Sequence, residues 1–459
     1  MADSLTVLIM AAGQGTRMKS ALPKVLHPVC GQPMLHWVIA AARDAGADNV
    51  VAITRPGDGV EQALPDGTGN APQTEGEGTG SAVLAARDQV DPDSTVIILS
   101  GDVPLTSSPL LRDLVAKHEN EQATATLLTT AELDPAGYGR IVRGADGGVE
   151  RIVETKHTEG VPPEELAIRE INIGTYAFQA RALFDALDRV GETNGERYLT
   201  DVFPLILQDG GRIAAHTTTD VSSAMGVNTR ADLAAVQDIA QRRVIDALAA
   251  SGVTFEAPAT ASVDATVQIA PDTTIANGVT LKGGTTIGEG CTIGPQTTIV
   301  DSSVGDGTTI LHSYLAECAV ASKATVGPFA YLRPEADIRD GAKIGTFVEV
   351  KKSTVGAGAK VPHLSYIGDA DIGERANVGG GAITANYHRG VKNRTVIGEG
   401  AKTGVHNSFV APVRVGDGAY TGAGSVISDD VPDGALGIAR SEQENVEGYA
   451  KRVEEGSGQ

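Results

Sequence analysis

The sequence predicts an α/β domain with a mostly parallel sheet, followed by a parallel β-helix of hexapeptide repeats. In the first half, short apolar runs alternate with helix-like segments, which is typical of a parallel sheet. In the second half, from Val263 to Val431, an aliphatic residue returns at every sixth position over long stretches. Neither the 3.6-residue period of a helix nor the two-residue period of a strand sustains such a step.

The six-residue step runs without a miss from Val263 to Ile299, slips twice, resumes from Val320 to Val350 and slips again before Val378. Small and polar residues (Gly, Ala, Asp, Ser and Thr) fill the positions between. A fixed period of this length indicates a solenoid of the parallel β-helix type. Three hexads form one triangular coil, small residues allow tight corners, and the inward aliphatic residues stack into a continuous core.

Length and charge limit the classes of function. At 459 residues the chain should hold more than one domain, and its net charge of −21 argues against nucleic acid or an anionic membrane as a partner. Cys30, Cys291 and Cys318 are too few and too scattered for a disulfide framework or a zinc site. With no basic N-terminal region and no apolar run of membrane-spanning length, we expect a cytoplasmic protein.

A glycine-rich loop follows the first apolar run. The run from Leu5 to Ala12 reads as a buried strand, and Gly13-Gln-Gly-Thr-Arg17-Met comes directly after it, with Pro23-Lys24 a few residues on. A strand that enters such a loop often presents backbone N–H groups to phosphate. The loop lacks the Gly-Lys-Ser/Thr of a Walker motif and the dinucleotide G-x-G-x-x-G. A glycine pair alone is usually a tight turn, but the added cations Arg17 and Lys24 favour a phosphate site.

The segments that follow support the α/β prediction. The pattern predicts a helix over residues 34–45, a strand at 50–53, a helix over 79–90, and a buried strand from Val96 that leads to Asp102. Ligands of a parallel α/β sheet bind beyond the carboxyl ends of its strands, where both the glycine loop and Asp102 should lie. A lone Asp at a strand end is usually a turn former or a helix cap.

The first half resembles the sugar nucleotidyltransferases, whose fold is Rossmann-like and whose opening signature is Ala-Ala-Gly-x-Gly-Thr-Arg-Met followed by Pro-Lys. The chain carries it complete, from Ala11 to Met18 and at Pro23-Lys24. The resemblance implies attack of a sugar phosphate on the α-phosphorus of UTP, with Arg17 and Lys24 offsetting the charge of the triphosphate. It also implies Mg²⁺ bound by Asp102 and by Asn228 in Gly-Val-Asn, since Mg²⁺ prefers carboxylate and phosphate oxygens.

The same resemblance assigns a binding set for UTP and UDP-N-acetylglucosamine. Gln73, Gly78 and Thr79 would recognise uracil. Ser100 stands where some members have Tyr before Gly-Asp, a departure that bears on stacking with the base. The full set is Ala11, Ala12, Gly13, Lys24, Gln73, Gly78, Thr79, Ser100, Asp102, Gly139, Glu154, Asn172 and Asn228, of which Gly139, Glu154 and Asn172 would bind the amino-sugar phosphate.

Two domains and a linker are expected. Residues 1–228 form the predicted uridylyltransferase domain, the Ala-rich segment 229–252 a linker helix, and residues 253–459 the β-helix domain with a C-terminal tail. The apolar face of the linker is dominated by Ala and Leu, which indicates packing rather than a partner site.

The hexapeptide step fails between Thr384 and Ile397. A solenoid often carries function where its step is interrupted, although a plain surface loop also explains an insertion. Upstream of the break lie Arg333, Lys351 and the segment Pro362-His363-Leu-Ser-Tyr366. A His beside a Pro can merely shape a turn, so the argument depends on the whole set.

Together these motifs resemble the acetyltransferase domain of the bacterial bifunctional N-acetylglucosamine-1-phosphate uridylyltransferase/glucosamine-1-phosphate acetyltransferases. The resemblance implies a left-handed β-helix, an exception to the usual handedness of parallel crossovers. It implies that His363 is the general base as the 2-amino group of the sugar attacks acetyl-CoA, and that Lys392 reaches a neighbouring subunit of a homotrimer. The implied sugar-phosphate set is Arg333, Lys351, Tyr366 and Asn377, and the implied acetyl-CoA set is Gly380, Asn386, Tyr387, Val405, Ala423 and Arg440.

Two departures from that family concern the acetyl site. Gly404-Val405-His406-Asn407 replaces Gly-Ser-Asp and loses a hydroxyl that helps to orient the amine, and Pro362 precedes His363 where some members have Gly. The sequence predicts a bifunctional enzyme that makes UDP-N-acetylglucosamine for peptidoglycan. One alternative is a nucleotidyltransferase whose β-helix is only a trimerisation scaffold, which should lack the His363 set. The other is a non-catalytic sugar-nucleotide sensor, which has no need of a metal ligand at the reacting phosphate.

Overall fold

A computed structural model describes residues 4–136, 138–144, 147–153, 161–193, 195–388 and 390–456. The chain divides into two compact units, Met1–Gln241 and Arg242–Gln459. The boundary falls within helix α7 (Arg230–Ala250), inside the segment expected to be a linker. The predicted domain limits at residues 228 and 252 stay a prediction.

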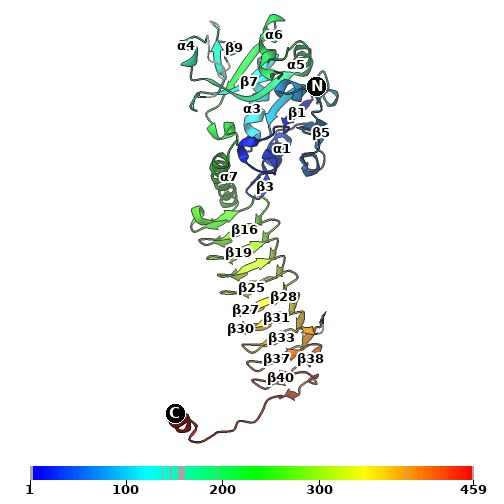
Figure 1. Ribbon diagram of the computed structural model, residues 1–459, viewed down its shortest axis with the longest axis vertical. Coiled ribbons are helices and arrows are strands. Elements are labelled where there is room, and N and C mark those ends of the chain that lie inside the picture. The colour runs from blue at the N-terminus through cyan, green and yellow to red at the C-terminus, as the bar shows by residue number, and fades with distance from the viewer. Residues whose placement is uncertain are drawn as a thin grey trace. The chain divides into compact units, whose positions relative to one another are not determined.

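A mixed, mostly parallel sheet forms the centre of the first unit (Figure 1). Its strand order is β11-β7-β10-β6-β1-β4-β5, with β8 and β9 paired at one side. Strand β1 is parallel to β4 and β6, whereas β10 is antiparallel to β6 and β7. The strands are β1 (Leu5–Met10), β4 (Asn49–Thr54), β5 (Gly69–Pro72), β6 (Thr95–Ser100), β7 (Ala125–Thr130), β8 (Arg140–Arg143), β9 (Val149–Val153), β10 (Ile171–Gln179) and β11 (Ile213–Thr217), and β2 (Pro28–Val29) pairs with β3 (Gln32–Pro33) outside the sheet.

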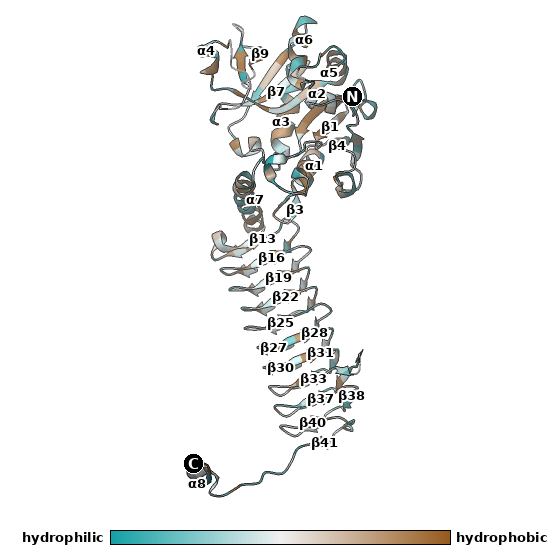
Figure 2. Cartoon of the chain, viewed as in Figure 1, coloured by the Kyte–Doolittle hydropathy of each residue, from teal (hydrophilic) through white to brown (hydrophobic). Residues whose placement is uncertain are grey.

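Both faces of this sheet are buried. Along β1, Leu8 belongs to one hydrophobic cluster and its neighbours Val7 and Ile9 to the other, as the alternation of side chains along a strand requires. The central strands β1, β4 and β6 are accordingly mostly hydrophobic (Figure 2), which is typical of a sheet covered on both sides. The helices of this unit, besides α7, are α1 (Met34–Asp44), α2 (Thr79–Leu84), α3 (Ser108–Asn120), α4 (Pro163–Leu166), α5 (Ala180–Leu187) and α6 (Val202–Gln208).

The helix predicted over residues 79–90 is shorter than expected. It ends at Leu84, and a separate 3-10 turn follows at Arg87–Gln89. The reason is visible in the backbone bonds, because Ala85 N–H donates to both Ser81 O and Ala82 O, and Ala86 N–H donates to Val83 O. Such three-residue bonds tighten the last turn of a helix and end it.

His118 on α3 makes the first unit sensitive to acid. Its ring is buried, its Nδ1 lies 2.9 Å from Thr126 Oγ1 on β7, and burial lowers its pKa from 6.5 to about 4. Between these values the unfolded chain binds a proton that the folded chain does not, so stability is lost as pH falls from 6.5 towards 4, by about 3 kcal/mol in total. We expect His118→Gln to remove most of this slope.

Trp37, the only tryptophan of the chain, lies in α1 and reports on the first unit alone. Denaturant titrations followed by its fluorescence at pH 7 and at pH 4.5 measure the effect. A smaller slope should remain in His118→Gln, since burial also lowers the pKa of His216. An unchanged slope in the variant would contradict the assignment.

Within the described residues, most strands of the second unit form three parallel sheets, in which successive coils stack on one another (Figure 1). We name each sheet by its first strand. The β12 sheet holds β12 (Thr254–Phe255), β15 (Thr274–Ile275), β18 (Thr292–Ile293), β21 (Thr309–Ile310), β24 (Thr325–Val326), β27 (Lys343–Thr346) and β30 (Lys360–His363). The β13 sheet holds β13 (Ser262–Val263), β16 (Thr280–Lys282), β19 (Thr298–Val300), β22 (Tyr314–Ala316), β25 (Tyr331–Leu332), β28 (Glu349–Lys351), β31 (Tyr366–Gly368), β33 (Ile383–Ala385), β37 (Ser408–Val410) and β40 (Val426–Ile427). The β14 sheet holds β14 (Gln268–Ile269), β17 (Thr286–Ile287), β20 (Ser303–Val304), β23 (Ala319–Val320), β26 (Asp337–Ile338), β29 (Thr354–Val355), β32 (Ala370–Ile372), β36 (Thr395–Ile397) and β38 (Val413–Val415).

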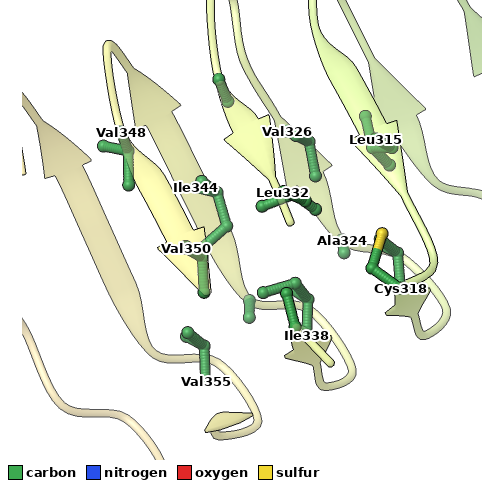
Figure 3. Close-up of a cluster of buried hydrophobic side chains, with 14 of the residues drawn as sticks. Leu315, Cys318, Ala324, Val326, Leu332, Ile338, Ile344, Val348, Val350 and Val355 are labelled. Carbon is green, nitrogen blue, oxygen red and sulfur yellow. The ribbon is translucent and has the colours of Figure 1, made fainter. Parts of the chain in front are cut away.

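The six-residue step accounts for the register of these sheets. Leu315, Leu332 and Val350 are paired on successive coils of the β13 sheet and point inward together (Figure 3). Val326 and Ile344 are paired in the same way in the β12 sheet. Where the step slips, one corner of the coil is shorter and the inward residues stay in register. The strands and repeats are those of the predicted left-handed β-helix class.

The inward residues should carry most of the stability of this unit. We expect Ile344→Ala to cost about 2–5 kcal/mol, because the side chain is fully buried and its loss leaves a cavity. The adjacent Lys343 points outward, so Lys343→Ala should change stability by less than about 0.5 kcal/mol. Denaturation followed by far-ultraviolet circular dichroism tests the pair, with Trp37 fluorescence to separate the first unit. Equal costs for the two variants would contradict the inward column.

The predicted interruption of the repeat is a β-hairpin. Between β32 and β36, extra residues form the antiparallel pair β34 (Tyr387–His388) and β35 (Val391–Lys392), which projects from the side of the coils (Figure 1). After the last coils, β39 (Tyr420–Thr421) pairs with β41 (Leu436–Gly437), and α8 (Tyr449–Gly456) ends the described chain. Among the described residues, no helix is both long and apolar enough to cross a membrane.

Candidate active sites

The glycine loop of the first unit positions two positively charged residues, Arg17 and Lys24. Gly15 has a φ of 59° and lies so close to Lys24 that a Cβ on it would come within 2.6 Å of Lys24 Cβ. Glycine tolerates both the positive φ and the close approach. Met18 and Val25 are buried and anchor the two short 3-10 turns that carry Arg17 and Lys24. The local sequence thus fixes the backbone from which the two flexible cationic side chains extend.

Both cations converge on the residues predicted to bind the metal. The Lys24 ammonium group forms an ion pair with Asp102 Oδ2 and donates to Asn228 Oδ1 at 3.2 Å. Arg17 Nη2 donates to the same Asn228 oxygen at 2.8 Å, and Ser100 Oγ donates to Asp102 Oδ1 at 2.6 Å. Residues separated by as many as 211 positions in sequence therefore share one network.

Asn228 is held by backbone contacts on both sides. Val227 N–H donates to the carbonyl of Asp102 at 2.9 Å, which joins the two predicted metal-binding segments. The Asp232 carboxylate accepts bonds from Asn228 N–H and Thr229 N–H at 2.9 and 2.8 Å, and so caps α7. Burial alone raises the pKa of Asp232, but these N–H donors outweigh it and lower the pKa below its usual value. A charged Asp232 thus fixes Asn228.

Two cavities meet at Asp102. One, of about 470 Å³, includes Gly13, Lys24 and Gln73 in its wall, and the other, of about 500 Å³, includes Asn172 and Asn228. Both are also lined by Met10, Thr79, Ser100 and Asp102. The predicted nucleotide residues and the predicted sugar residues thus lie in adjoining cavities, with the candidate metal ligand at the junction.

The remaining predicted residues of the first unit surround these cavities. Ala12 and Gly78 line the smaller one, whereas Ala11 is buried beneath the loop and bonds to the backbone of Ile53. Asn172 Nδ2 donates to Tyr176 Oη at 2.8 Å, and Asn172 N–H donates to the carbonyl of Gly139 at 2.9 Å. Glu154 lies outside the described residues.

The sequence reasoning missed the segment from Glu196 to Asp201. Glu196 lines the smaller cavity, and Tyr198, Thr200 and Asp201 line the larger one, where burial raises the pKa of Asp201. The segment also contacts Thr79, which is predicted to recognise uracil, because Thr79 Oγ1 accepts a hydrogen bond from Leu199 N–H at 2.9 Å. The available signal was a run of polar and aromatic residues directly before the apolar helix α6.

In the second unit, His363 begins a line of residues along one corner of the coils. It ends β30, its side chain is exposed, and its carbonyl accepts a bond from Gly381 N–H at 3.0 Å on the next coil. On the following coils, His406 N–H donates to Gly380 O and Gly424 N–H donates to Val405 O, both at 2.8 Å. These bonds place Gly380 and Val405, two of the predicted acetyl-CoA residues, on successive coils at the same corner as His363. Arg440 Nη1 closes the line by donating to the carbonyl of Ala423 at 3.0 Å.

Three of the four predicted sugar-phosphate residues, Arg333, Lys351 and Tyr366, lie along the β13 sheet. Arg333 N–H donates to the carbonyl of Val350, the neighbour of Lys351, at 2.9 Å, and its side chain forms an ion pair with Glu349 at 2.7 Å. The Lys392 ammonium of the hairpin lies against Lys351 of its own chain and lowers the pKa of Lys351, because two like charges are close. Such a pair of cations gains from an added anion.

The hairpin joins this surface through Asn386. Its Nδ2 donates to Asp369 Oδ2 at 2.5 Å and lies 3.5 Å from Tyr366 Oη, while Tyr387 beside it is exposed. Asn377 is placed differently, because it bridges Lys360 and Lys402 in line with the β12 sheet. A single chain therefore does not bring Asn377 onto the surface that carries Tyr366.

Comparisons with known proteins identify the family of this chain. The MobA-like NTP transferase family matches residues 7–204, and the bacterial transferase hexapeptide family, of six repeats, matches residues 266–301. The bifunctional protein GlmU of Mycolicibacterium vanbaalenii is 43% identical over 98% of this chain and 94% of its own length. This chain belongs to the GlmU family. GlmU proteins of Geobacillus sp. and Halalkalibacterium halodurans are 44% and 45% identical, each over 97% of this chain and 97% and 98% of their own lengths. The predicted family is confirmed, as is the α/β nucleotidyltransferase fold followed by a hexapeptide β-helix.

Proposed function

We propose that this GlmU chain catalyses two successive transfers on an amino-sugar phosphate. The second unit acetylates glucosamine-1-phosphate with acetyl-CoA. The first unit transfers UMP from UTP to the resulting N-acetylglucosamine-1-phosphate, which yields UDP-N-acetylglucosamine and pyrophosphate. The main support is that one chain carries both residue sets, the hydrogen-bond network at Asp102 and the residues along the coil corner that begins at His363. The chain is also related to bifunctional proteins over nearly its whole length.

In the uridylyl reaction, the α-phosphorus of UTP lies near Asp102, where the two cavities adjoin. The smaller cavity takes the nucleotide and the larger one the sugar phosphate, whose anionic oxygen attacks while pyrophosphate leaves. No covalent nucleophile is required, so the chain contributes orientation and charge. Arg17 and Lys24 offset the negative charge that two phosphorylated substrates bring into one cleft.

Asp102 and Asn228 suit Mg²⁺. Their oxygens already share one cationic partner, Lys24, so their spacing fits a single cation. Among the described residues, no group of three or more His, Cys, Asp or Glu is placed to hold a metal, and Mg²⁺ typically takes few protein ligands and completes its shell with phosphate and water. When bound, Mg²⁺ supplies charge neutralisation at the phosphates.

In the acetyl reaction, the nitrogen of the sugar's 2-amino group attacks the thioester carbonyl, and His363 accepts a proton from that amino group. The carbon–sulfur bond then breaks and the amide forms, while the departing CoA sulfur takes the proton from His363 and leaves as the thiol. Arg333 and Lys351 hold the phosphate of the sugar, and Lys392 adds a third positive charge beside it. The residues from Gly380 to Ala423 along the corner guide the acyl-CoA, with Arg440 at the end of the line.

A homotrimer completes the acetyl site. Asn377 lies in line with the β12 sheet and Tyr366 on the β13 sheet, so a site that uses both draws one of them from a second copy. A row of apolar side chains also stands exposed at one corner of the coils, with Phe329, Phe347 and Leu364 at 54%, 58% and 61% exposure. Apolar rows of this kind are typical of protein interfaces. Because the substrates are cytoplasmic metabolites, the protein acts in the cytoplasm.

Two assays on the purified protein test the proposal. One follows pyrophosphate release from UTP and N-acetylglucosamine-1-phosphate with Mg²⁺, and the other follows CoA release from acetyl-CoA and glucosamine-1-phosphate. Both products should appear. Pyrophosphate alone would reduce the β-helix to a scaffold, and neither product would favour the sensor.

Val405 is the departure that we expect to limit acetyl transfer. It stands where the family has Ser, and it is half exposed on the coil after Gly380. Val405→Ser should raise the rate of CoA release by about 3–10-fold, since one hydrogen bond is worth about 0.5–1.5 kcal/mol. Val405→Thr, similar in shape but bearing a hydroxyl, serves as the matched variant. A loss of rate in both would show that the valine is the better residue here.

A further inference from the structure

Lys24 binds the two oxygens that a divalent cation needs. Its ammonium group pairs with Asp102 Oδ2 and donates to Asn228 Oδ1 at 3.2 Å. Both side chains of the ion pair are largely buried, with 14% and 15% of their surfaces exposed, so water screens the pair only weakly. The ammonium group and a divalent cation cannot occupy this position together.

The other contacts of the network leave Asp102 in place if Lys24 moves. Ser100 Oγ holds the second oxygen of the carboxylate at 2.6 Å, and Val227 N–H holds the backbone carbonyl of Asp102 at 2.9 Å. The backbone of Lys24 is fixed by its contact with Gly15 and by the buried neighbour Val25. At Asp102, the flexible end of the Lys24 side chain is therefore the partner that can leave.

A nucleotide offers Lys24 another acceptor. Lys24 lines the smaller cavity together with Gly13 and Gln14 of the phosphate loop, so triphosphate oxygens in this cavity lie within its reach. Arg55, which lines the same cavity, donates to the carbonyl of Ala12 at 3.2 Å and pairs with Glu77 at 3.8 Å, rather than with Asp102 or Asn228.

We propose that Lys24 couples metal binding to nucleotide binding, by competing with the divalent cation for Asp102 and Asn228 until a triphosphate takes up its ammonium group. The inference rests on the proposed uridylyl site and adds an order of events to it. Without nucleotide the enzyme binds divalent cations weakly, which keeps the metal from being held where it has no phosphate to act on. By linkage, the nucleotide raises metal affinity and the metal raises nucleotide affinity by the same factor.

The test measures Mn²⁺ binding to the full-length protein without nucleotide, from the electron paramagnetic resonance signal of free Mn²⁺. Lys24→Met should bind Mn²⁺ about 10-fold or more tightly than the wild type. Lys24→Gln, a polar replacement, should behave alike and covers the case in which the methionine variant fails to fold. Arg55→Met removes the same charge from the same cavity and should change the affinity by less than about 3-fold, which separates direct competition from a general field effect.

Adding UTP separates failure of this inference from failure of the proposed site. Wild-type protein with UTP should bind Mn²⁺ more tightly than free UTP does. The substitution Asp102→Asn should abolish this gain in affinity. If Asp102→Asn changes nothing, the proposed metal site and this inference both fail. If Asp102→Asn behaves as expected, two results would overturn the coupling role of Lys24 while the proposed function stands. One is that Lys24→Met and the wild type bind Mn²⁺ equally without nucleotide, and the other is that Arg55→Met matches Lys24→Met.

Discussion

Replacing His363 by alanine should lower acetyl transfer by about 10²–10⁴-fold and leave uridylyl transfer unchanged. The magnitude is that of a lost general base, since the 2-amino group must give up a proton as the amide forms. His363 is suited to this role because its ring is exposed at a coil corner, above the line of Gly380 and Val405, and is not used as a core residue. Initial rates of CoA release and of pyrophosphate release, measured on the same preparation, give both numbers.

His312 provides the matched control for this variant. It lies at the same corner on an earlier coil, where its ring packs against that of Phe329 with the ring centroids 5.4 Å apart. His312→Ala removes an imidazole from the same edge of the β-helix and should retain both activities. A similar loss of CoA release in the two variants would mean that the corner as a whole, and not the base, had been damaged.

Replacing Asp102 by asparagine should lower pyrophosphate release by about 10²–10³-fold with no change in CoA release. The substitution keeps the shape of the side chain and removes the charge that pairs with Lys24 and faces both cavities. Metal binding stabilises transition-state charge by several kcal/mol, and each 1.4 kcal/mol corresponds to about a factor of ten. The dependence of the rate on Mg²⁺ concentration is measured alongside.

Asp93→Asn is the control. Asp93 lies on the surface of the same unit, paired with Arg181, and its side chain is 78% exposed. Its loss should leave both rates within about 2-fold, because exposed ion pairs contribute little. Full activity in Asp102→Asn, at any Mg²⁺ concentration, would remove Asp102 from the mechanism.

The β-helix could be predicted almost completely from the sequence. A period of six assigns an inward position to residues such as Leu332 and Val350, and pairing on successive coils follows because each coil contacts only its neighbours. The fold of the α/β unit could be predicted less completely from the sequence. The alternation of apolar runs predicts strands such as β1 and β6, but the antiparallel placement of β10 depends on long-range packing, which leaves no local pattern in the sequence.

The candidate sites divide in the same way. Residue type and spacing identify Arg17 and Lys24 as candidates for binding phosphate, and the family resemblance adds Asp102 as a candidate metal ligand. Sequence does not reveal that Lys24 binds both Asp102 and Asn228, since that contact depends on how distant loops meet. It also does not reveal that Tyr198 and its neighbours enter the cavity wall, or that Asn377 lies on another sheet than Tyr366.

The most direct test of the account is one reaction that needs both units. Purified protein is supplied with glucosamine-1-phosphate, UTP, Mg²⁺ and acetyl-CoA labelled in the acetyl group, and the sugar nucleotide is analysed by mass spectrometry. The account predicts UDP-N-acetylglucosamine that carries the label, formed only when both co-substrates are present. Absence of labelled sugar nucleotide, with label remaining in acetyl-CoA, would contradict the claim that one chain performs both transfers.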